Sequence, residues 1–375
     1  MSMILDGSNG VTFNDSSLQG AAASPYGLKN RIINGDMRID QRNAGASVTA
    51  STTAAQTYAS LDRWAYIVSQ ASKFTMQQNA GSVTPPAGFK NYLGCTSTAA
   101  TSVGSSDYFN VNQPIEGFNV ADLDWGTANA KTVTLSFWVR SSLTGTFGGS
   151  IRNSVPDRSY PFSYTISSAN TWTQISITIP GDTTGTWGTT NGIGIHVNFS
   201  LGMGSTFSST ANSWQAGNYV SVTGSTSVVG TNGATWYITG VQLEVGSTAT
   251  PFERRMYGQE LALCQRYYQY FGGENAYNYF GGTASITSTT NAFLPIIFMT
   301  QMRAAPSFTY VGALSTFDLR SSGNASHTPS ALAQDITTSK VFALQITSSG
   351  LTANTPGVMI GANSTAGQLC FSAEL

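Results

Sequence analysis

The sequence predicts an all-β protein: a jelly-roll sandwich as a shoulder domain, a short linking helix, and a C-terminal β-sandwich as a tip domain. Many short runs alternate apolar and polar residues, which is the period of a half-buried strand. Clusters of glycine, threonine, asparagine and aspartate separate these runs, as turns do. At one place only, residues 253–272, the apolar spacing lengthens to that of a helix. We therefore predict four consecutive regions.

The first region, residues 1–29, is rich in glycine, serine and alanine and contains few apolar residues. Such a segment rarely folds alone, because it cannot bury enough apolar surface to offset the entropy lost on ordering. We expect it to become ordered only by packing against copies of itself or against another protein.

The shoulder domain, residues 30–252, carries the clearest alternating runs. Turn clusters such as residues 181–185 and 230–233 lie between them. Many short strands with regular turn signals indicate a sandwich or a barrel. The best-defined strands are predicted at 132–140, 173–179, 194–201 and 235–244.

The linking helix is predicted over residues 253–272. Glu253 suits the positive end of a helix, and two glycines at 272 and 273 end it. A stripe of apolar and aromatic residues lies on one helix face and is better buried against other subunits or against the two β-domains, which favours a homotrimer. The stripe comprises Tyr257, Leu261, Cys264, Tyr268 and Phe271.

The tip domain, residues 273–375, returns to short alternating runs. Strands are predicted at 291–299, 307–311, 340–347 and 368–373. This region has a compact, strand-rich composition, so we expect it to fold as a second β-sandwich.

Composition excludes several function classes. Charged residues make up 9% of the chain and the net charge is −1, so no basic surface for nucleic acid or for an anionic membrane is expected. Three widely spaced cysteines and two histidines predict no metal site, and no cofactor is expected. Neither a signal peptide nor an apolar run of membrane-spanning length is visible, so we expect synthesis in a reducing cytoplasm and no membrane insertion.

Three blocks of sequence resemble phage tail-fibre and minor tail proteins that contain a jelly-roll similar to carbohydrate-binding modules. They are NRIINGDMRIDQRN at 30–43, SLDRW at 60–64, and the QLE, TPFERR and ELALCQRYY motifs within 236–270. The start of the chain, DGSNGVTFNDSSLQG, is similar to the virion-proximal end of such fibres, although Ser16 and Ser17 depart from the usual Gly-Thr. Together the blocks touch about residues 1–270.

The resemblance implies a structural virion protein of a bacteriophage tail, made in the cytoplasm of the host bacterium. It implies that residues 1–29 attach to other tail or baseplate proteins. It also implies that the C-terminal domain recognises a host surface polysaccharide or lipopolysaccharide. A purely structural tail or baseplate linker is the alternative within the same class.

Exposed aromatic side chains are the candidates for carbohydrate binding, because sugar rings stack their C–H faces on them. In the tip, Tyr277, Tyr279 and Phe280 lie in a glycine- and asparagine-rich run, although they could instead alternate into a core strand. In the shoulder, Trp187 and Trp214 lie in loops, although a loop tryptophan can also plug one end of a sandwich core.

Charges inside strands of so weakly charged a chain are expected to be paired. We predict that Asp62 or Glu244 pairs with Arg63, Arg254 or Arg255, within the shoulder or at its helix end. Such buried pairs are expected to be structural and to fix the register.

Catalysis is not expected. Glu116, Asp122 and Asp124 could be imagined as the carboxylate pair of a glycosidase. A tailspike depolymerase of this kind usually carries a parallel β-helix repeat of roughly 20–29 residues, and no fixed period of that length is visible.

Overall fold

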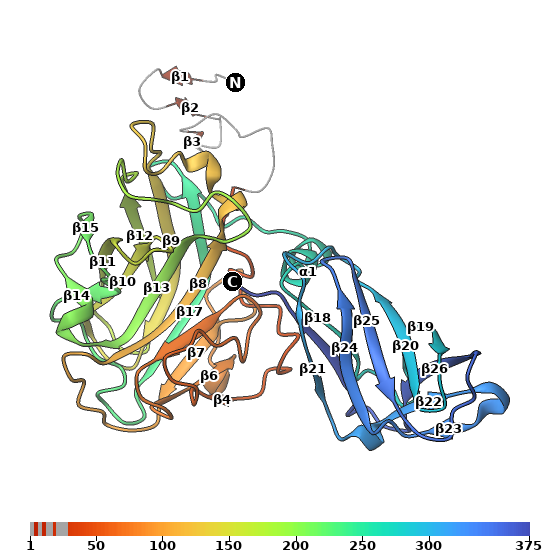
Figure 1. The fold of residues 1–375 in the computed structure, drawn as a ribbon. Coiled ribbons are helices and arrows are strands. Elements are labelled where there is room, and N and C mark those ends of the chain that lie inside the picture. The colour runs from red at the N-terminus through yellow and green to blue at the C-terminus, as the bar shows by residue number, and fades with distance from the viewer. Residues whose placement is uncertain (1–3, 7–9, 13–17, 20–28) are drawn as a thin grey trace.

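The computed structural model describes residues 4–6, 10–12, 18–19 and 29–375. It contains two β-sandwiches side by side with a single helix at their junction (Figure 1). Within 1–29, three short strands form an antiparallel sheet: β1 (Ile4–Asp6), β2 (Gly10–Thr12) and β3 (Leu18–Gln19). The remainder of the predicted attachment segment lies outside the described residues.

The shoulder is a jelly-roll sandwich of two six-stranded sheets, in the orders β15-β11-β10-β13-β8-β5 and β12-β9-β17-β7-β6-β4. Aromatic side chains such as Trp64, Phe137, Phe199 and Trp236 fill the core between the sheets. The first sheet comprises β5 (Ala65–Val68), β8 (Tyr108–Glu116), β10 (Gly145–Arg152), β11 (Arg158–Ile166), β13 (Ile193–Met203) and β15 (Gln215–Ala216). The second comprises β4 (Val48–Thr49), β6 (Phe74–Gln78), β7 (Leu93–Ser97), β9 (Val133–Ser141), β12 (Thr173–Ile179) and β17 (Thr235–Val245).

The four strands predicted in the shoulder are confirmed as β9, β12, β13 and β17. Alternation explains why they form. In β13, Ile195, Val197 and Phe199 point into the core, so the residues between them lie on the outer face of the sheet. A small parallel pair, β14 (Ser208–Ser209) with β16 (Ser221–Val222), belongs to the long connection from β13 to β17.

The helix is shorter than the sequence predicts. Helix α1 spans Tyr257–Gln265, and Tyr268–Gly272 forms strand β18 instead, which pairs with β27 (Gln368–Ser372). The run Tyr-Tyr-Gln-Tyr-Phe favours a strand, and a free edge of the tip sheet is available to pair with it. The predicted stripe is therefore wrong beyond Cys264.

Part of the stripe is buried by the chain itself. Cys264 is fully buried and packs with Ile33, Ile39 and Tyr267, and Leu261 lies against the same cluster. The helix thus no longer requires other subunits to cover its apolar face.

The tip is a second sandwich, of a three-stranded sheet in the order β18-β27-β21 and a seven-stranded sheet in the order β23-β22-β26-β19-β20-β25-β24. Phe371 of β27 packs edge-to-face against Phe342, with 4.8 Å between ring centroids, near the centre of the core. The four strands predicted there are confirmed as β20, β21, β25 and β27. The remaining strand bounds are β19 (Tyr279–Ile286), β20 (Asn291–Ile297), β21 (Ser307–Val311), β22 (Phe317–Arg320), β23 (Ser326–His327), β24 (Ala331–Thr337), β25 (Val341–Thr347) and β26 (Thr355–Gly361).

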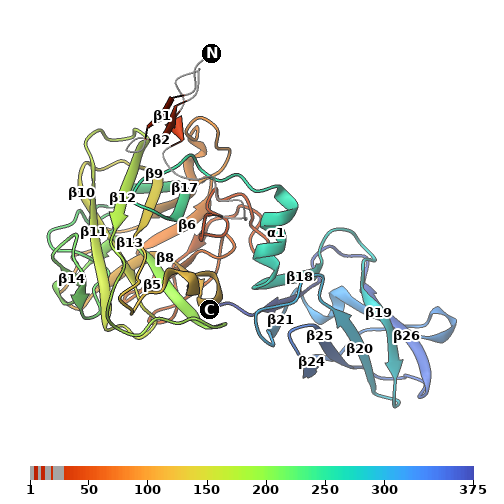
Figure 2. The same cartoon turned by 90° about the horizontal axis from the view of Figure 1, so that it is seen from above.

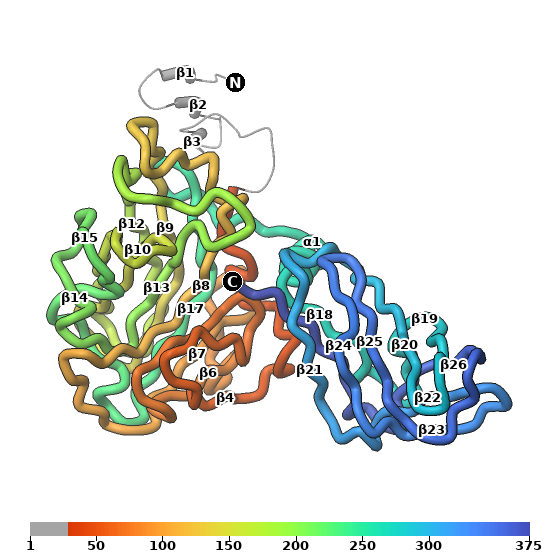
Figure 3. Tube along the Cα trace, viewed as in Figure 1, coloured from red at the N-terminus to blue at the C-terminus, as the bar shows by residue number. Residues whose placement is uncertain are grey.

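The chain passes between the two sandwiches twice, once through α1 and again after β27, whose end returns to the shoulder (Figures 2 and 3). At this junction Glu374 pairs with Arg63 and, at 2.6 Å, with Arg42. The two guanidinium groups also stack on aromatic rings, Arg63 on Tyr267 at 3.6 Å and Arg42 on Tyr268 at 3.7 Å. Residues from both sandwiches therefore share one charged cluster.

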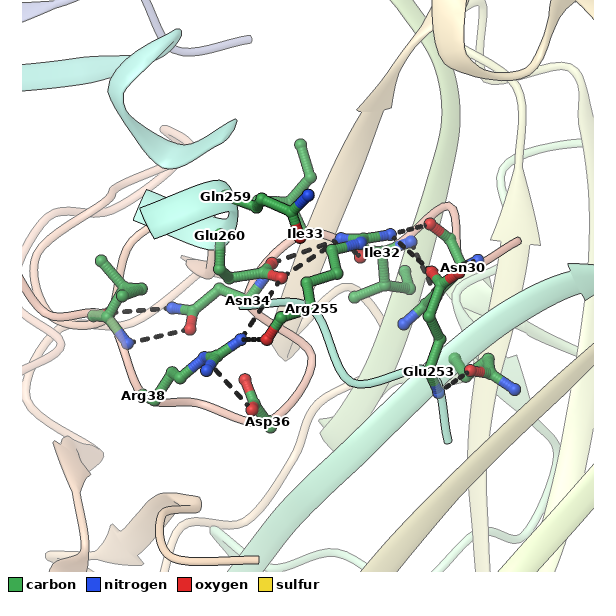
Figure 4. A network of polar contacts seen from close by, with 12 residues as sticks. Asn30, Ile32, Ile33, Asn34, Asp36, Arg38, Glu253, Arg255, Gln259 and Glu260 are labelled. Atoms are coloured by element: carbon green, nitrogen blue, oxygen red, sulfur yellow. Dashed lines mark hydrogen bonds and ion pairs between the residues drawn. The ribbon is translucent and has the colours of Figure 1, made fainter. Parts of the chain in front are cut away.

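A second cluster joins α1 to the start of the shoulder (Figure 4). Arg255, almost fully buried, lies 3.3 Å from carboxylate oxygens of both Glu253 and Glu260, and its guanidinium also donates to the backbone carbonyls of Asn30 and Ile32. Because Asn30 and Ile32 belong to the first block of the sequence resemblance, that block is a structural support for the helix.

Four of the five predicted ion-pair residues are buried and Arg254 is exposed, and the partners differ from the prediction. Asp62 has Arg42 at 3.9 Å and Glu244 has Lys29 at 4.0 Å. Glu244 also accepts hydrogen bonds from Gln242 and Thr250. Arg63 and Arg255 pair with other acids, as described above, and Arg254 stacks on Phe89 at 4.6 Å. The predicted pairing of Asp62 or Glu244 with Arg63, Arg254 or Arg255 is therefore wrong, because those three arginines are engaged by other acids or by an aromatic ring.

Candidate functional site

One outer face of the shoulder carries polar side chains that are buried. Asn110 and Asn112 of β8 and His196, Asn198 and Ser200 of β13 alternate with core residues, and each is at most 5% exposed. The outer face of a sheet normally meets water. Here residues 204–222, from the connection after β13, lie over it.

Gly148 marks the close approach of that connection to β10. A Cβ at this position would collide with the hydroxyl of Ser221 and lie 3.0 Å from the backbone nitrogen of Val222. Only glycine lets the connection lie this close to the sheet. Residues 204–222 and the outer face of the sheet therefore enclose a cavity between them, where an uncovered sheet would present a flat surface.

The cavity, which we call the shoulder pocket, has a volume of about 260 Å³. Tyr108 and Phe207 form an aromatic wall, perpendicular to each other with their ring centroids 5.4 Å apart. Polar groups from the sheet and from the covering segment face this wall. The lining residues are Ile67, Tyr108, Asn110, Arg152, Asn198, Phe207, Asn218 and Val220.

A ladder of side-chain hydrogen bonds fixes the amides on the sheet side of the pocket. The Asn110 side-chain amide donates to Asn198 Oδ1 at 3.2 Å, and Asn198 Nδ2 donates to Ser150 Oγ at 3.1 Å. Each amide is held from one side, so its orientation is set before anything binds.

Several buried polar atoms of this sheet face have no hydrogen-bond partner among the described residues. They are Asn112 Oδ1, Ser200 Oγ, His196 Nδ1 and Arg152 Nε. Buried polar groups are nearly always paired, because an unpaired one loses its hydration without compensation. A concentration of four on one face indicates groups that await water or a ligand.

The imidazole of His196 is neutral. Burial, and secondarily the positive charge of Arg152 on the neighbouring strand, lowers the pKa of His196 to about 3. One ring nitrogen therefore donates and the other accepts. The face thus offers uncharged donors and acceptors beside one cation, which suits hydrogen bonding to a polar ligand.

The carboxylates considered for glycosidase chemistry are each engaged elsewhere. Glu116 binds Arg266 at 2.6 Å and Tyr267 at the junction. Asp122 pairs with Arg31 at 2.7 Å, and Asp124 lies 3.7 Å from Lys131. None of the three lines the shoulder pocket.

The two predicted tryptophans of the shoulder, Trp187 and Trp214, pack with Trp125 at one end of the core. The three ring centroids lie 4.7–5.5 Å apart, all edge-to-face. Each indole N–H donates to a backbone carbonyl, at 2.8–3.1 Å. This is the arrangement of a plug, although Trp187 also lines a hollow of about 130 Å³. A role of these residues in carbohydrate binding stays a prediction.

The predicted aromatic residues of the tip divide into two groups. Tyr277 is 50% exposed and Tyr279 is 66% exposed, so both are accessible. Phe280 is 1% exposed and packs on Phe317 with 5.3 Å between ring centroids. Because Phe280 follows Tyr279 in β19, alternation turns it into the core, and its assignment to a binding site is wrong.

The sequence contains a pattern that indicates the polar sheet face of the shoulder pocket. Asparagine occupies positions 110 and 112, and histidine, asparagine and serine occupy positions 196, 198 and 200. Such alternation indicates an outer sheet face. Residues 204–222 cover that face. Because this segment has no strong periodicity, its position was not predictable from the sequence.

Among the described residues, no group of three histidine, cysteine, aspartate or glutamate side chains is placed to hold a metal ion. No helix in the described part of the chain is long and apolar enough to cross a membrane.

No protein-family model matches this chain, and no curated protein sequence matches it. Among solved structures it is similar to the enzymatically active domain of tailspike protein 4 from bacteriophage CBA120, with 14% identity and a TM-score of 0.31. That match covers 58% of this chain but 22% of the tailspike chain, so the similar part is about a fifth of that protein.

Two further matches are to shorter proteins. A putative sugar-binding protein from Bacteroides thetaiotaomicron has 12% identity and a TM-score of 0.31, over 58% of this chain and 100% of that one. The family 11 carbohydrate-binding module from Clostridium thermocellum, solved with a mixed-linked tetrasaccharide, has 11% identity and a TM-score of 0.26, over 50% and 91%. At these values no ligand or activity is transferred to this chain.

Proposed function

We propose that this chain is a glycan-binding protein of a bacteriophage tail, and that it binds sugar in the shoulder pocket. The observation that carries the proposal is a pocket in which polar side chains face an aromatic wall, on a sheet face that also holds unpaired, buried polar atoms. A few preformed polar groups in a partly apolar pocket are typical of small-ligand sites.

Sugars match this chemistry because each ring has an apolar C–H face and hydroxyls that both donate and accept. Tyr108 and Phe207 supply the apolar contact. The amides of Asn110, Asn198 and Asn218 supply donors and acceptors without a large desolvation penalty. We propose binding without turnover, since no carboxylate lines the pocket.

The tail assignment is supported by the motifs at 30–43, 60–64 and 236–270. In this proposal the protein belongs to the virion, residues 1–29 attach it to other tail or baseplate proteins, and three copies associate. Exposed apolar side chains support self-association: Met256 and Tyr257 at the start of α1, and the cross-strand pair Ile297 and Val341 in the tip. Light scattering should then give three times the chain mass of 39.5 kDa.

The tip is the second candidate for the glycan site, because Tyr277 and Tyr279 are exposed on it. Two matched substitutions separate the sites. Tyr108→Ala removes the aromatic wall of the shoulder pocket, and Tyr279→Ala removes an equal side chain from the tip. Binding of each variant to a glycan array and to whole bacteria is compared with the parent, after circular dichroism has established that both are folded.

Loss of binding in Tyr108→Ala alone supports the shoulder pocket. Loss in Tyr279→Ala alone moves the site to the tip and rejects the pocket. Retention in both variants rejects both sites. Bound oligosaccharides recovered at their original mass support binding without turnover, and shortened ones contradict it.

A further inference from the structure

Arg152 is the only cation that lines the shoulder pocket, within the part of the chain that the structure describes. It ends strand β10 on the polar outer face, directly opposite His196 of β13. Nη1 donates to Asn218 Oδ1 at 2.6 Å, which anchors the guanidinium to the covering segment. The group is thus held in place from the side of the loop.

No acidic side chain compensates this guanidinium. Among the described residues, the salt bridges within 4.0 Å involve other arginines and lysines, and Nε of Arg152 is buried without any partner. Burial lowers the pKa of Arg152 to about 10, with no neighbouring acid acting to raise it. Arg152 is half-buried, and a charge withdrawn from water without a counter-ion is costly, so proteins rarely keep one that has no use.

Arg158, on the neighbouring strand, has a carboxylate where Arg152 has none. It forms two hydrogen bonds to Asp182, at 2.6 and 2.8 Å. Among the described residues, Arg140, Arg254 and Arg303 likewise form no ion pair, but they stack on aromatic rings or donate to backbone carbonyls. Arg152 differs from these three because it lines the shoulder pocket.

The surroundings of Arg152 add hydrogen-bonding capacity but no further charge. His196 is neutral and its Nδ1 is unpartnered. Asn110, Asn198 and Asn218 present amides, and Tyr108 and Phe207 present aromatic faces. A free inorganic anion could bind Arg152 but would make no apolar contact with the aromatic wall. An anionic sugar can contact both.

We propose that the shoulder pocket selects an acidic sugar, whose carboxylate or phosphate group supplies the missing counter-ion of Arg152. This inference rests on the proposed glycan-binding function and names its ligand class. The net charge of −1 does not oppose it, because net charge governs long-range attraction and not one contact inside a pocket.

The test uses three series of monosaccharides that differ only at C6: glucose, galactose and mannose, each with its hexuronate and its hexose 6-phosphate. Affinities for the full-length protein are measured by ligand-observed NMR at constant ionic strength. Hydrogen bonds to a charged partner are stronger than neutral ones, so the anionic member of at least one series should bind roughly ten-fold or more tighter than its hexose. Whether hexuronate or phosphate binds better identifies the source of the charge.

Arg152→Gln is expected to abolish that preference, so that the anionic member of a series binds no more tightly than its hexose. Arg140→Gln is the matched control, because Arg140 lies on the other sheet, where it donates to the carbonyl of Asn170 and stacks on Tyr237. The control should keep the parental preference. Melting temperatures of both variants verify that they are folded.

Four outcomes overturn the inference. If hexoses bind as tightly as their acids in every series, the sugar site stands and the acid selection falls. If acetate or inorganic phosphate competes as well as the anionic sugars, Arg152 binds simple anions only. A preference that survives in Arg152→Gln places the selecting group elsewhere. If none of the nine sugars binds, the proposed sugar site is rejected together with the inference.

Discussion

The junction holds buried arginines and the shoulder pocket holds a half-buried one, in opposite electrostatic settings. At the junction, Arg63 has Glu374, and Arg255 lies between Glu253 and Glu260. In the pocket, Arg152 has only the amide oxygen of Asn218. The two settings have different consequences for stability. Removing the partner of a paired buried charge destabilises the fold, whereas removing a charge that has no partner stabilises it.

This comparison assigns a structural role to Arg63 and Arg255, and it leaves ligand binding as the role of Arg152. The pair of Arg63 with Glu374 joins the shoulder to the chain that leaves the tip, and the Arg255 cluster joins the helix to the start of the shoulder. Arg152 lies on one sheet, and no element depends on it beyond its contact to Asn218. Four substitutions can break or sharpen this comparison.

The largest effect is expected for Glu374→Gln at the junction. It leaves Arg63 and Arg42 without their shared carboxylate, and breaking a buried pair from one side costs about 3–5 kcal/mol. Glu274→Gln, at an exposed position, is the control and should melt like the parent. Calorimetry measures both. A Glu374→Gln variant as stable as the control would mean that the junction charges are solvated.

The next effect concerns acid. The folded pKa of His196, about 3, lies below its unfolded value of about 6.5, so the unfolded state takes up the proton first as the pH falls. The stability associated with neutral His196 is complete above pH 6.5 and is lost progressively toward pH 3. At pH 4 the loss attributable to this group should be about 3 kcal/mol.

Urea unfolding of the parent and of His196→Gln, at pH 7.5 and at pH 4, measures that difference. The variant should lose less stability than the parent between the two pH values. His327→Gln, which changes the other histidine of the chain, serves as the comparison. Equal acid sensitivity of the parent and His196→Gln would show that His196 can be protonated in the folded state.

Arg152→Gln is expected to raise stability by about 1 kcal/mol, since it removes an uncompensated charge and keeps a donor for Asn218. The sign of the stability change is more informative than its size, and a thermal melt without ligand measures it. A destabilisation of comparable size would place Arg152 in the same class as the junction arginines.

The smallest effect is expected for Tyr279→Ala. This side chain is 66% exposed, and surface substitutions usually change stability by no more than about 0.5 kcal/mol. A chemical denaturation curve checks it. A larger loss would show that Tyr279 is buried in an assembly, most simply between copies of the chain.

Local patterns in the sequence predicted the architecture well. The strands predicted at 173–179 and 307–311 match β12 and β21 residue for residue, because alternation over seven or five residues is a local property. The helix was predicted seven residues too long at its C-terminal end. Helical spacing continued by chance into Tyr268 and Phe271, while pairing with β27, about a hundred residues later, decided the outcome.

Interactions between distant residues limited the prediction of sites. The partner of Arg63 is Glu374, separated by 311 residues, and the acids nearest in sequence were the wrong ones. The alternation of Asn110 and Asn112 indicated an outer sheet face. Its burial depends on where residues 204–222 fold, and these carry no strong period. The exposure of the tyrosines in the tip was predictable from their local sequence. The burial of a polar sheet face under a segment from elsewhere in the chain was not.

The placement of Glu374 also sets an order of events during synthesis. Arg42 and Arg63 emerge from the ribosome more than three hundred residues before the carboxylate that neutralises them. Domains generally fold as they emerge, the N-terminal one first. The shoulder therefore forms before Arg63 has its carboxylate, whereas Arg42 already has Asp62 at 3.9 Å. The final alignment of the two sandwiches waits for the emergence of residue 374.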